Sequence, residues 1–420
     1  MYTQTNDRLN YLDAARAFAL ILGIIFHASL SFMPMFIGWA VMDISTSSFV
    51  TDFVLISHSF RMELFFLIAG FFSHMSFHQK GLPAFLQSRF KQIAIPFIVG
   101  WFLLRPLLVS GWIIGAESKQ GEANVLQAII TGFSALASLP NDLFVGTHLW
   151  FLYYLLLLTL MLLSFRYLIC ANKPIRQYLM KVFDNVVAWL CNGQFTILIL
   201  AAPTGVCLWY MNHWGVDTPD RSLVPNISVL IVYGGFFLFG WLLHRQPALL
   251  EKLSDLSRVK FIVCTCAIAT TLWLSPHEML PGHSLYLIFK AAFALSYAIM
   301  MWSIISLVLG ACKHLFNQSN KVIRYLANTS YWMYLIHLPI VVWLQSAFAE
   351  LPTNWLVKLI VISTITIGFS LALYEAVVRR TFIGALLNGK RVTNTQFGLS
   401  LGKIVPTRGT KAITKTKKID

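Results

Sequence analysis

Charged side chains are scarce in this sequence. They make up 12% of the 420 residues, whereas hydrophobic residues make up 57%; an ordinary soluble chain is about 25% charged. So few charges leave too little polar surface to cover a water-soluble particle of this size. The composition therefore excludes a soluble enzyme and indicates that lipid is the main solvent of the folded chain.

Cysteines and internal repeats are also few. The six cysteines lie in or beside apolar stretches without a Cys-x-x-Cys spacing, so the sequence predicts neither a disulfide framework nor a metal site. No period of about 20–50 residues stands out, which weakens an interpretation as a transporter built from repeats. The net charge of +15 comes without a DNA- or RNA-binding motif, so no nucleic-acid partner is expected.

Long apolar runs are what the sequence does contain. About 20 apolar residues in a helix cross a hydrocarbon core of about 30 Å. The runs are uniformly apolar rather than alternating in polarity, which predicts helices and not a membrane barrel. We expect an all-α integral membrane protein with about ten transmembrane helices, near Tyr11–Phe32, Phe53–Phe77, Ile93–Gly115, His148–Cys170, Phe195–Met211, Val229–Leu243, Phe261–Leu274, Leu285–Leu309, Ser330–Phe348 and Leu356–Val377.

Basic residues divide the predicted loops into two sets. One set of loops and the C-terminal tail hold most of the Lys and Arg, whereas the other set holds only Lys119 and Arg221. Because Lys and Arg are enriched in short cytoplasmic loops, we expect both termini in the cytoplasm. Residues 1–380 form the predicted membrane domain, and residues 381–420 form a basic, flexible tail. The first span lacks a cleavage signature and is expected to stay in the mature protein.

The first span carries three ionisable residues, which are costly within a membrane and so indicate a partner or a function. Asp13 and Arg16 are three residues apart, which predicts an ion pair on one helix face. His27 follows Arg16 by eleven residues, so it returns to within about 20° of the same azimuth, about 16 Å further along. A guanidinium can hold phosphate or carboxylate, and imidazole suits proton transfer. The alternative is a histidine that only packs between helices.

The second span carries a further polar cluster. His58 and Arg61 share a helix face, and the acidic partner of Arg61 is either Glu63 or a residue on another helix. Arg89 and Lys91 open the third span from the cytoplasmic side. Topology alone explains basic residues at that boundary, unless a phosphate ligand is independently implied.

Two more histidines lie in or next to predicted spans. His148 begins the fourth span just before Trp150; an aromatic belt at the membrane surface explains Trp150 but not His148. His337 lies two residues before a proline, so it is either a structural cap at a kink or a pocket residue. Arg105 and Lys290 are further intramembrane cations, either of which can receive an acidic acyl group.

These residues give the chain a resemblance to the acyltransferase-3 family of integral membrane proteins, and within it to the OpgC-like (MdoC) succinyltransferases of periplasmic glucans. The first-span signature is Arg followed by ten residues and His, and the second-span signature is His-Ser-Phe-Arg-Met. They stand here as Leu12-Asp13-Ala14-Ala15-Arg16 through Gly23-Ile-Ile-Phe-His27, and as His58-Ser59-Phe60-Arg61-Met62 with Phe65, Phe66 and Gly70.

The resemblance implies an O-acyltransferase of the bacterial inner membrane. Such an enzyme moves an acyl group, succinyl or acetyl, from cytoplasmic acyl-CoA to a hydroxyl of a periplasmic or cell-surface carbohydrate such as an osmoregulated glucan. The expected partners are acyl-CoA, the carbohydrate acceptor and the lipid bilayer, with no permanently bound cofactor and no metal. His27 is the implied catalytic residue and Arg16 its support. The substrate-binding candidates are Asp13, His58, Arg61, Glu63, Arg89, Lys91, His148, Trp150 and His337.

We expect neutral His27 to deprotonate the acceptor hydroxyl, with Arg61 or His148 stabilising the oxyanion. A transient acyl group on the histidine is left open. The chain departs from the family where Gln92 stands three residues after Arg89 in place of a second arginine. A rival interpretation is a transporter or flippase that uses the intramembrane His and Arg residues as a relay. A third is an inactive acyltransferase-like scaffold.

Overall fold

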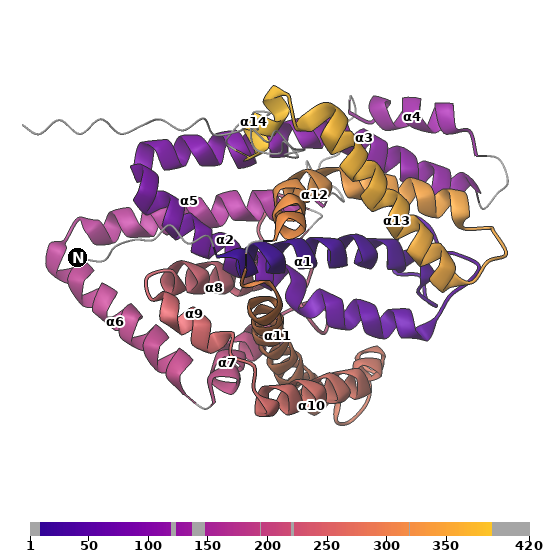
Figure 1. Ribbon diagram of the computed structural model, residues 1–420. Coiled ribbons are helices and arrows are strands. Elements are labelled where there is room, and N and C mark those ends of the chain that lie inside the picture. The colour runs from indigo at the N-terminus through magenta and orange to yellow at the C-terminus, as the bar shows by residue number, and fades with distance from the viewer. Residues whose placement is uncertain are drawn as a thin grey trace, which may run out of the picture.

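The computed structural model describes residues 9–118, 123–136, 148–193, 195–219, 222–318 and 320–388. Within these ranges the chain is helical and contains no strand, so the predicted all-α fold is confirmed. The helices α1 (Asn10–Ser29), α3 (Ile95–Ser118) and α5 (Trp150–Cys170) run along one common direction, horizontal in Figure 1. The site described below lies among these helices.

The other helices pack around these three. They are α2 (Ser48–Arg89), α4 (Val125–Ser134), α6 (Lys173–Asn192), α7 (Thr196–Trp209), α8 (Ile227–Leu243), α9 (Pro247–Leu253), α10 (Arg258–Leu274), α11 (Tyr286–Phe316), α12 (Lys321–Phe348), α13 (Trp355–Leu373) and α14 (Phe382–Asn388). Short 3-10 turns follow α1 and α10, at Leu30–Phe32 and Ser275–Met279. Five-residue π-helical turns follow α2 and α13, at Phe90–Ala94 and Tyr374–Val378.

Each of the ten predicted spans falls on a helix of the described chain. Seven helical stretches there are long and apolar enough to cross a membrane, or eight if the sharply bent pair α6 and α7 is one span. One stretch, Ser48–Ser118, contains two predicted spans, and α8 is shorter than a full crossing. The number of crossings and the side that each terminus faces stay predictions. Beyond residue 388, the predicted tail lies outside the described residues.

Glycines let α2 and α8 approach closely. A Cβ on Gly70 would collide with the backbone carbonyl of Phe237, and a Cβ on Gly240 would collide with that of Leu67. Small residues at such contacts are the usual means by which helix backbones pack in a membrane. This contact holds the polar part of α2 against the rest of the bundle.

A proline explains the π-helical turn between α2 and α3. Pro96 has no N–H, so it cannot donate the helical hydrogen bond to the carbonyl of Gln92. That carbonyl instead accepts a hydrogen bond of 2.5 Å from the hydroxyl of Tyr331 on α12. The wide turn and the tyrosine together satisfy the backbone at this point, and they join the start of α3 to α12 next to Arg89.

α1 and α12 lie side by side over most of their length. Near the start of α1, Arg16 donates a hydrogen bond of 2.7 Å to the carbonyl of Ala327 and forms the predicted ion pair with Asp13, at 3.3 Å. Near its end, the side-chain amide of Gln345 donates to the carbonyl of His27, at 2.9 Å. The two helices are therefore held in register at both ends.

Candidate functional site

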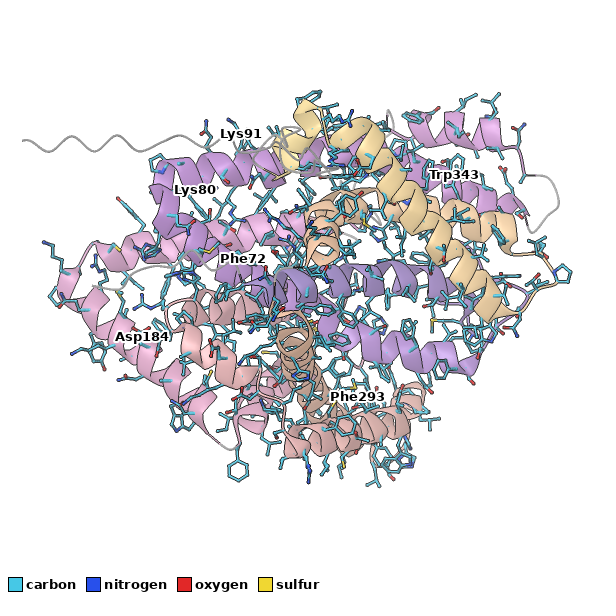
Figure 2. All side chains as sticks on the ribbon, viewed as in Figure 1. Phe72, Lys80, Lys91, Asp184, Phe293 and Trp343 are labelled. Carbon is cyan, nitrogen blue, oxygen red and sulfur yellow. The ribbon has the colours of Figure 1, made fainter. Side chains whose placement is uncertain are left out.

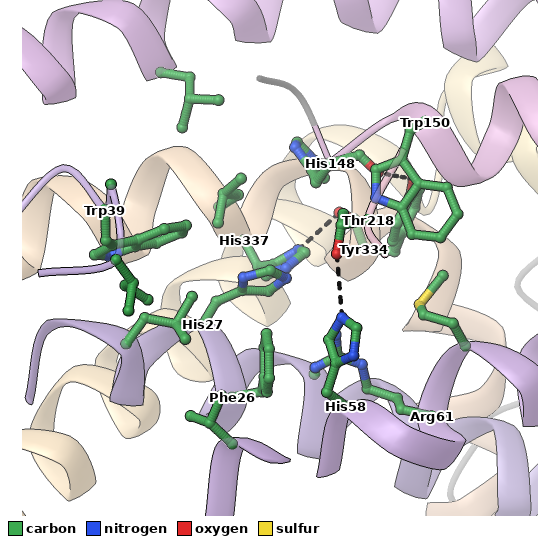
Figure 3. Close-up of a pocket in the computed structure, with 18 of the residues that line it drawn as sticks. Phe26, His27, Trp39, His58, Arg61, His148, Trp150, Thr218, Tyr334 and His337 are labelled. Carbon is green, nitrogen blue, oxygen red and sulfur yellow. Dashed lines mark hydrogen bonds between the residues drawn. The ribbon is translucent and has the colours of Figure 1, made fainter. Parts of the chain in front are cut away.

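A cavity of about 910 Å³ opens between α1, α2, α3, α12 and the start of α5. Four histidines and two arginines line it, and the described residues of its wall include no Asp or Glu. Such a chamber carries positive charge without a fixed counter-ion, which favours an anionic ligand or an anionic transition state. The six residues are His27, Arg61, His58, Arg105, His148 and His337 (Figure 3 shows all but Arg105 labelled).

His27 occupies the last turn of α1, at the centre of the cavity (Figure 3). Its ring lies edge-on to Phe26, parallel to Trp39 at 5.9 Å, and 5.3 Å from the ring of His337. Its Nδ1 is buried and has no hydrogen-bond partner in the described part of the chain. Packing, and not a carboxylate, therefore sets the orientation of this imidazole.

Trp39 is held in place by Gln345, a residue that is 1% exposed. The Gln345 side-chain carbonyl accepts a hydrogen bond of 2.9 Å from the Trp39 indole. The amide nitrogen of Gln345 donates to the carbonyls of His27 and Ala28, at 2.9 and 3.0 Å. One side chain on α12 thus positions both the end of α1 and the ring stacked on His27.

The backbone of α12 fixes the tautomer of His337. The Nδ1 of His337 lies 2.7 Å from the carbonyl of Tyr334 and 3.1 Å from that of Met333. A carbonyl can only accept, so Nδ1 carries the proton and Nε2 carries the lone pair. His337 therefore has both roles that its sequence position left open, because it bonds its own helix and lines the cavity.

His148 is anchored to α12 through a backbone carbonyl that Pro339 leaves without its helical donor. Pro339 cannot donate to the carbonyl of Leu335, and that carbonyl accepts a hydrogen bond of 2.8 Å from Nε2 of His148. The carbonyl of His148 in turn accepts a hydrogen bond of 2.6 Å from the Tyr334 hydroxyl. The ring of His148 lies 5.3 Å from that of His337.

The second-span residues form the opposite wall of the cavity. His58 is 3.1 Å from the hydroxyl of Thr218, a residue in the connection between α7 and α8. The guanidinium of Arg61 lies over the ring of Phe26 at 4.0 Å. Neither candidate partner of Arg61, Glu63 or an acid on another helix, is within ion-pair distance, since Arg61 forms no ion pair among the described residues. For Glu63, the reason is that positions 61 and 63 are two residues apart on the helix, so their side chains point to different faces.

The sequence candidates fall into two groups. Six line the cavity, whereas the others do not: Asp13 and Arg16 lie nearer the start of α1, and Glu63 is buried between helices. Lys91 is exposed at the periphery of the molecule (Figure 2). Arg89 lies over the ring of Phe85 at 4.8 Å. The six that meet are His27, His58, Arg61, His148, Trp150 and His337.

Sequence reasoning missed Trp39, Thr218 and Gln345. Trp39 and Thr218 lie in connections between helices, where tryptophan and threonine are unremarkable in any membrane protein. Gln345 did give a signal, because an amide within an apolar span needs a partner. Among the described residues, no group of three or more His, Cys, Asp or Glu is arranged to hold a metal ion.

Comparison with known proteins identifies the relatives of this chain. The model of a protein family described as an acyltransferase domain (acyltransferase-3) matches residues 9–375. Glucans biosynthesis protein C from Escherichia coli strains SMS-3-5 and K12 is 26% identical over 394 residues, which cover 93% of this chain and 97% of the relative. No solved structure matches the chain. The family match spans the helices that build the histidine cavity, and the chain belongs to the acyltransferase-3 family.

Proposed function

We propose that this protein is a membrane O-acyltransferase that uses cytoplasmic acyl-CoA to acylate a hydroxyl of a periplasmic or cell-surface carbohydrate. The observation that carries the proposal is the cavity in which His27 and His337 lie 5.3 Å apart, next to two arginines. Acyl transfer from a thioester needs a group that moves the hydroxyl proton and donors that stabilise the oxyanion. Imidazoles and guanidiniums supply both.

The proposed path of the donor follows a row of side chains from the π-helical turn before α3 to this chamber. Arg89 and Gln92 stand where α3 begins, and Gln92 is bonded to Tyr331 of α12. Tyr331 and Tyr334 stack with their ring planes 10° apart, and Tyr334 borders the cavity. A CoA phosphate held by Arg89 would leave the pantetheine arm to follow these tyrosines towards the histidines.

The charge of the cavity favours succinyl over acetyl as the acyl group. Arg105 lines the cavity and is 5% exposed, and its Nε and one terminal nitrogen have no hydrogen-bond partner among the described residues. A buried guanidinium left unpaired is costly, and the free carboxylate of a succinyl group would satisfy it. Lys290, the other candidate for this role, lies over Trp209 outside the cavity.

The acceptor is proposed from the relatives. Proteins named for glucan biosynthesis match nearly the whole chain, so a glucan hydroxyl is the acceptor to test, and the bacterial inner membrane is the proposed location. The rings of Trp39 and Trp112, whose centroids are 5.2 Å apart in an edge-to-face arrangement, line the cavity. Aromatic rings of this kind offer an apolar surface that a sugar ring can contact.

The test is acyl transfer by the purified full chain in detergent. Wild-type protein is expected to release free CoA from succinyl-CoA only when a glucan acceptor is present. His27→Ala should lower the rate about 10²–10⁴-fold. His277→Ala is the matched control, because His277 lies outside the cavity and should leave the rate unchanged.

Two results would contradict the proposal. One is activity of His27→Ala within about three-fold of wild type, since a catalytic imidazole contributes far more than that. The other is transport of a glucan by the wild type without any thiol release, which is the outcome that a transporter or flippase predicts.

A further inference from the structure

The cavity holds four imidazoles, but their hydrogen bonds make them unequal as bases. A neutral imidazole accepts a proton only at the nitrogen that carries the lone pair. Which nitrogen that is depends on the partner of the other one. In His337 both carbonyl contacts are made by Nδ1, so the lone pair is on Nε2. The Nε2 of a ring bonded to its own helix through Nδ1 points away from that helix, and His337 lines the cavity.

Two of the other histidines are less suited to accept a proton. His148 donates from Nε2 to the carbonyl of Leu335, and its unprotonated Nδ1 is buried out of reach of a substrate. His58 has its Nε2 engaged by the hydroxyl of Thr218 at 3.1 Å. Neither ring therefore combines a fixed tautomer with a free lone pair.

His27 is suited to the complementary role. Its Nδ1 is buried without a partner among the described residues. A buried N–H without an acceptor is rarer and costlier than an unpaired lone pair, so the proton belongs on Nε2. A neutral His27 in this tautomer donates a hydrogen bond from Nε2, and neutral imidazoles of this kind can polarise a carbonyl.

We infer that His337 is the catalytic base and that His27 is the donor that stabilises the oxyanion; this inference rests on the proposed function. The acceptor hydroxyl gives its proton to Nε2 of His337 while its oxygen bonds to the acyl carbonyl carbon. The carbonyl oxygen takes the negative charge and accepts a hydrogen bond from Nε2–H of His27. The oxyanion then collapses to a carbonyl group, the C–S bond breaks, and the CoA thiolate takes the proton from His337. The products are the ester, free CoA and both imidazoles in their starting tautomers.

The tautomers are measured without any reference to activity. Full-length protein labelled with ¹⁵N-histidine is placed in lipid bilayers, and nitrogen NMR spectra are compared with those of His337→Gln and His27→Gln to assign the two rings. We expect an unprotonated Nε2 in His337 and a protonated Nε2 in His27. A proton on Nε2 of His337 would overturn the inference, even in a preparation that transfers no acyl group.

The kinetic test uses glutamine in place of His337, because its amide can form hydrogen bonds but cannot accept and release a proton. His337→Gln should lower kcat about 10²–10⁴-fold while the KM for succinyl-CoA changes little. Added imidazole should restore part of the rate of His337→Ala. His277→Gln is the matched control, because the Nδ1 of His277 contacts the carbonyl of Leu274 at 3.2 Å in the same way, outside the cavity. A His337→Gln rate within about three-fold of wild type refutes the assignment; an inactive wild type refutes only the proposed function.

Discussion

Arg105 is the residue whose surroundings bear most directly on the acyl group. It lies within α3, and its guanidinium faces the ring of Trp101 at 5.1 Å. Arg61 also has a terminal nitrogen without a described partner, but it is covered by the ring of Phe26. The two arginines stand on different helices around the same chamber. Arg61 can therefore serve the reacting carbonyl while Arg105 binds the distal carboxylate of the succinyl group.

Arg105→Gln is expected to change the choice of donor. A charge-assisted hydrogen bond is worth about 1.5–3 kcal/mol, so the preference for succinyl-CoA over acetyl-CoA should fall about ten-fold or more. The measurement is competition between equal concentrations of the two donors, with the products separated by mass spectrometry. Lys290→Gln is the control, and an unchanged ratio in Arg105→Gln would remove Arg105 from the acyl site.

The sequence predicted individual side chains well where their chemistry is unusual in lipid. His27, His58, His148 and His337 were all visible as ionisable groups in or beside apolar runs, and the structure brings them together. The contacts that orient them were not visible. Gln345 bonds a residue 318 positions away, and nothing in one sequence specifies such a pair.

At the scale of the helix, prolines supply the acceptors that hold the site. A proline within a helix leaves one carbonyl of the preceding turn without its donor. The carbonyl freed by Pro96 accepts from Tyr331, and the carbonyl freed by Pro339 accepts from His148. The first bond joins α12 to the π-helical turn before α3, and the second joins it to His148 in the cavity wall. The kinks are therefore points of attachment between helices.

The variant Pro339→Ala separates the stability of α12 from the positioning of His148. Alanine restores the helical N–H, which then competes with His148 for the Leu335 carbonyl. Proline in a helix interior costs about 3 kcal/mol, so the melting temperature in detergent should stay the same or rise. Activity should fall about ten-fold or more, because a small misplacement of a site residue is expensive.

The control for this experiment is Pro203→Ala in α7, another proline inside a helix but one remote from the cavity. It should leave activity unchanged. Full activity of Pro339→Ala would show that the hydrogen bond to His148 has no part in the reaction.

The course of the helices was largely predictable, and their irregularities were not. Apolar runs located all ten predicted spans on helices, because hydrophobic length is a strong signal in membranes. The continuation of α2 through a π-helical turn into α3 was not predicted. It depends on the hydroxyl of Tyr331, which comes from a helix more than two hundred residues later.

At the scale of the whole molecule, a buried ion pair fixes the connection between α1 and α2. Lys358 of α13 lies 2.7 Å from Asp43, and both side chains are almost wholly buried. Lys358 also donates to the carbonyl of Ala349. The connection that carries Asp43 also carries Trp39, so this pair anchors the segment that covers His27.

Lys358→Met should destabilise the protein by about 3–5 kcal/mol, because it leaves the Asp43 charge buried and unpaired. The double variant Lys358→Met, Asp43→Asn should recover most of that loss. Thermal unfolding in detergent measures both.

The matched control is the partly exposed pair Lys313 and Asp255, whose nitrogen and oxygen are 3.6 Å apart. Lys313→Met should cost less than about 1 kcal/mol. A Lys358→Met variant as stable as the control would show that water reaches the Asp43 site.

The chamber itself was only partly predictable. The sequence indicated which residues were out of place in lipid, but the wall of the chamber draws on seven separate segments of the chain. A prediction from spacing reaches only residues on one helix, such as Arg16 and His27. The distance from His27 to His337 depends on how α1 and α12 pack.

The spacing along α12 makes its central stretch sensitive to length. Tyr331 bonds Gln92 in the π-helical turn before α3. Tyr334 and the carbonyl freed by Pro339 both bond His148. His337 faces His27 in the cavity. One inserted or deleted residue turns everything after it by about 100°, so the last of these groups would lose their partners together. We expect an insertion or deletion in this stretch to abolish activity, whereas the loops at the bundle ends should accept both.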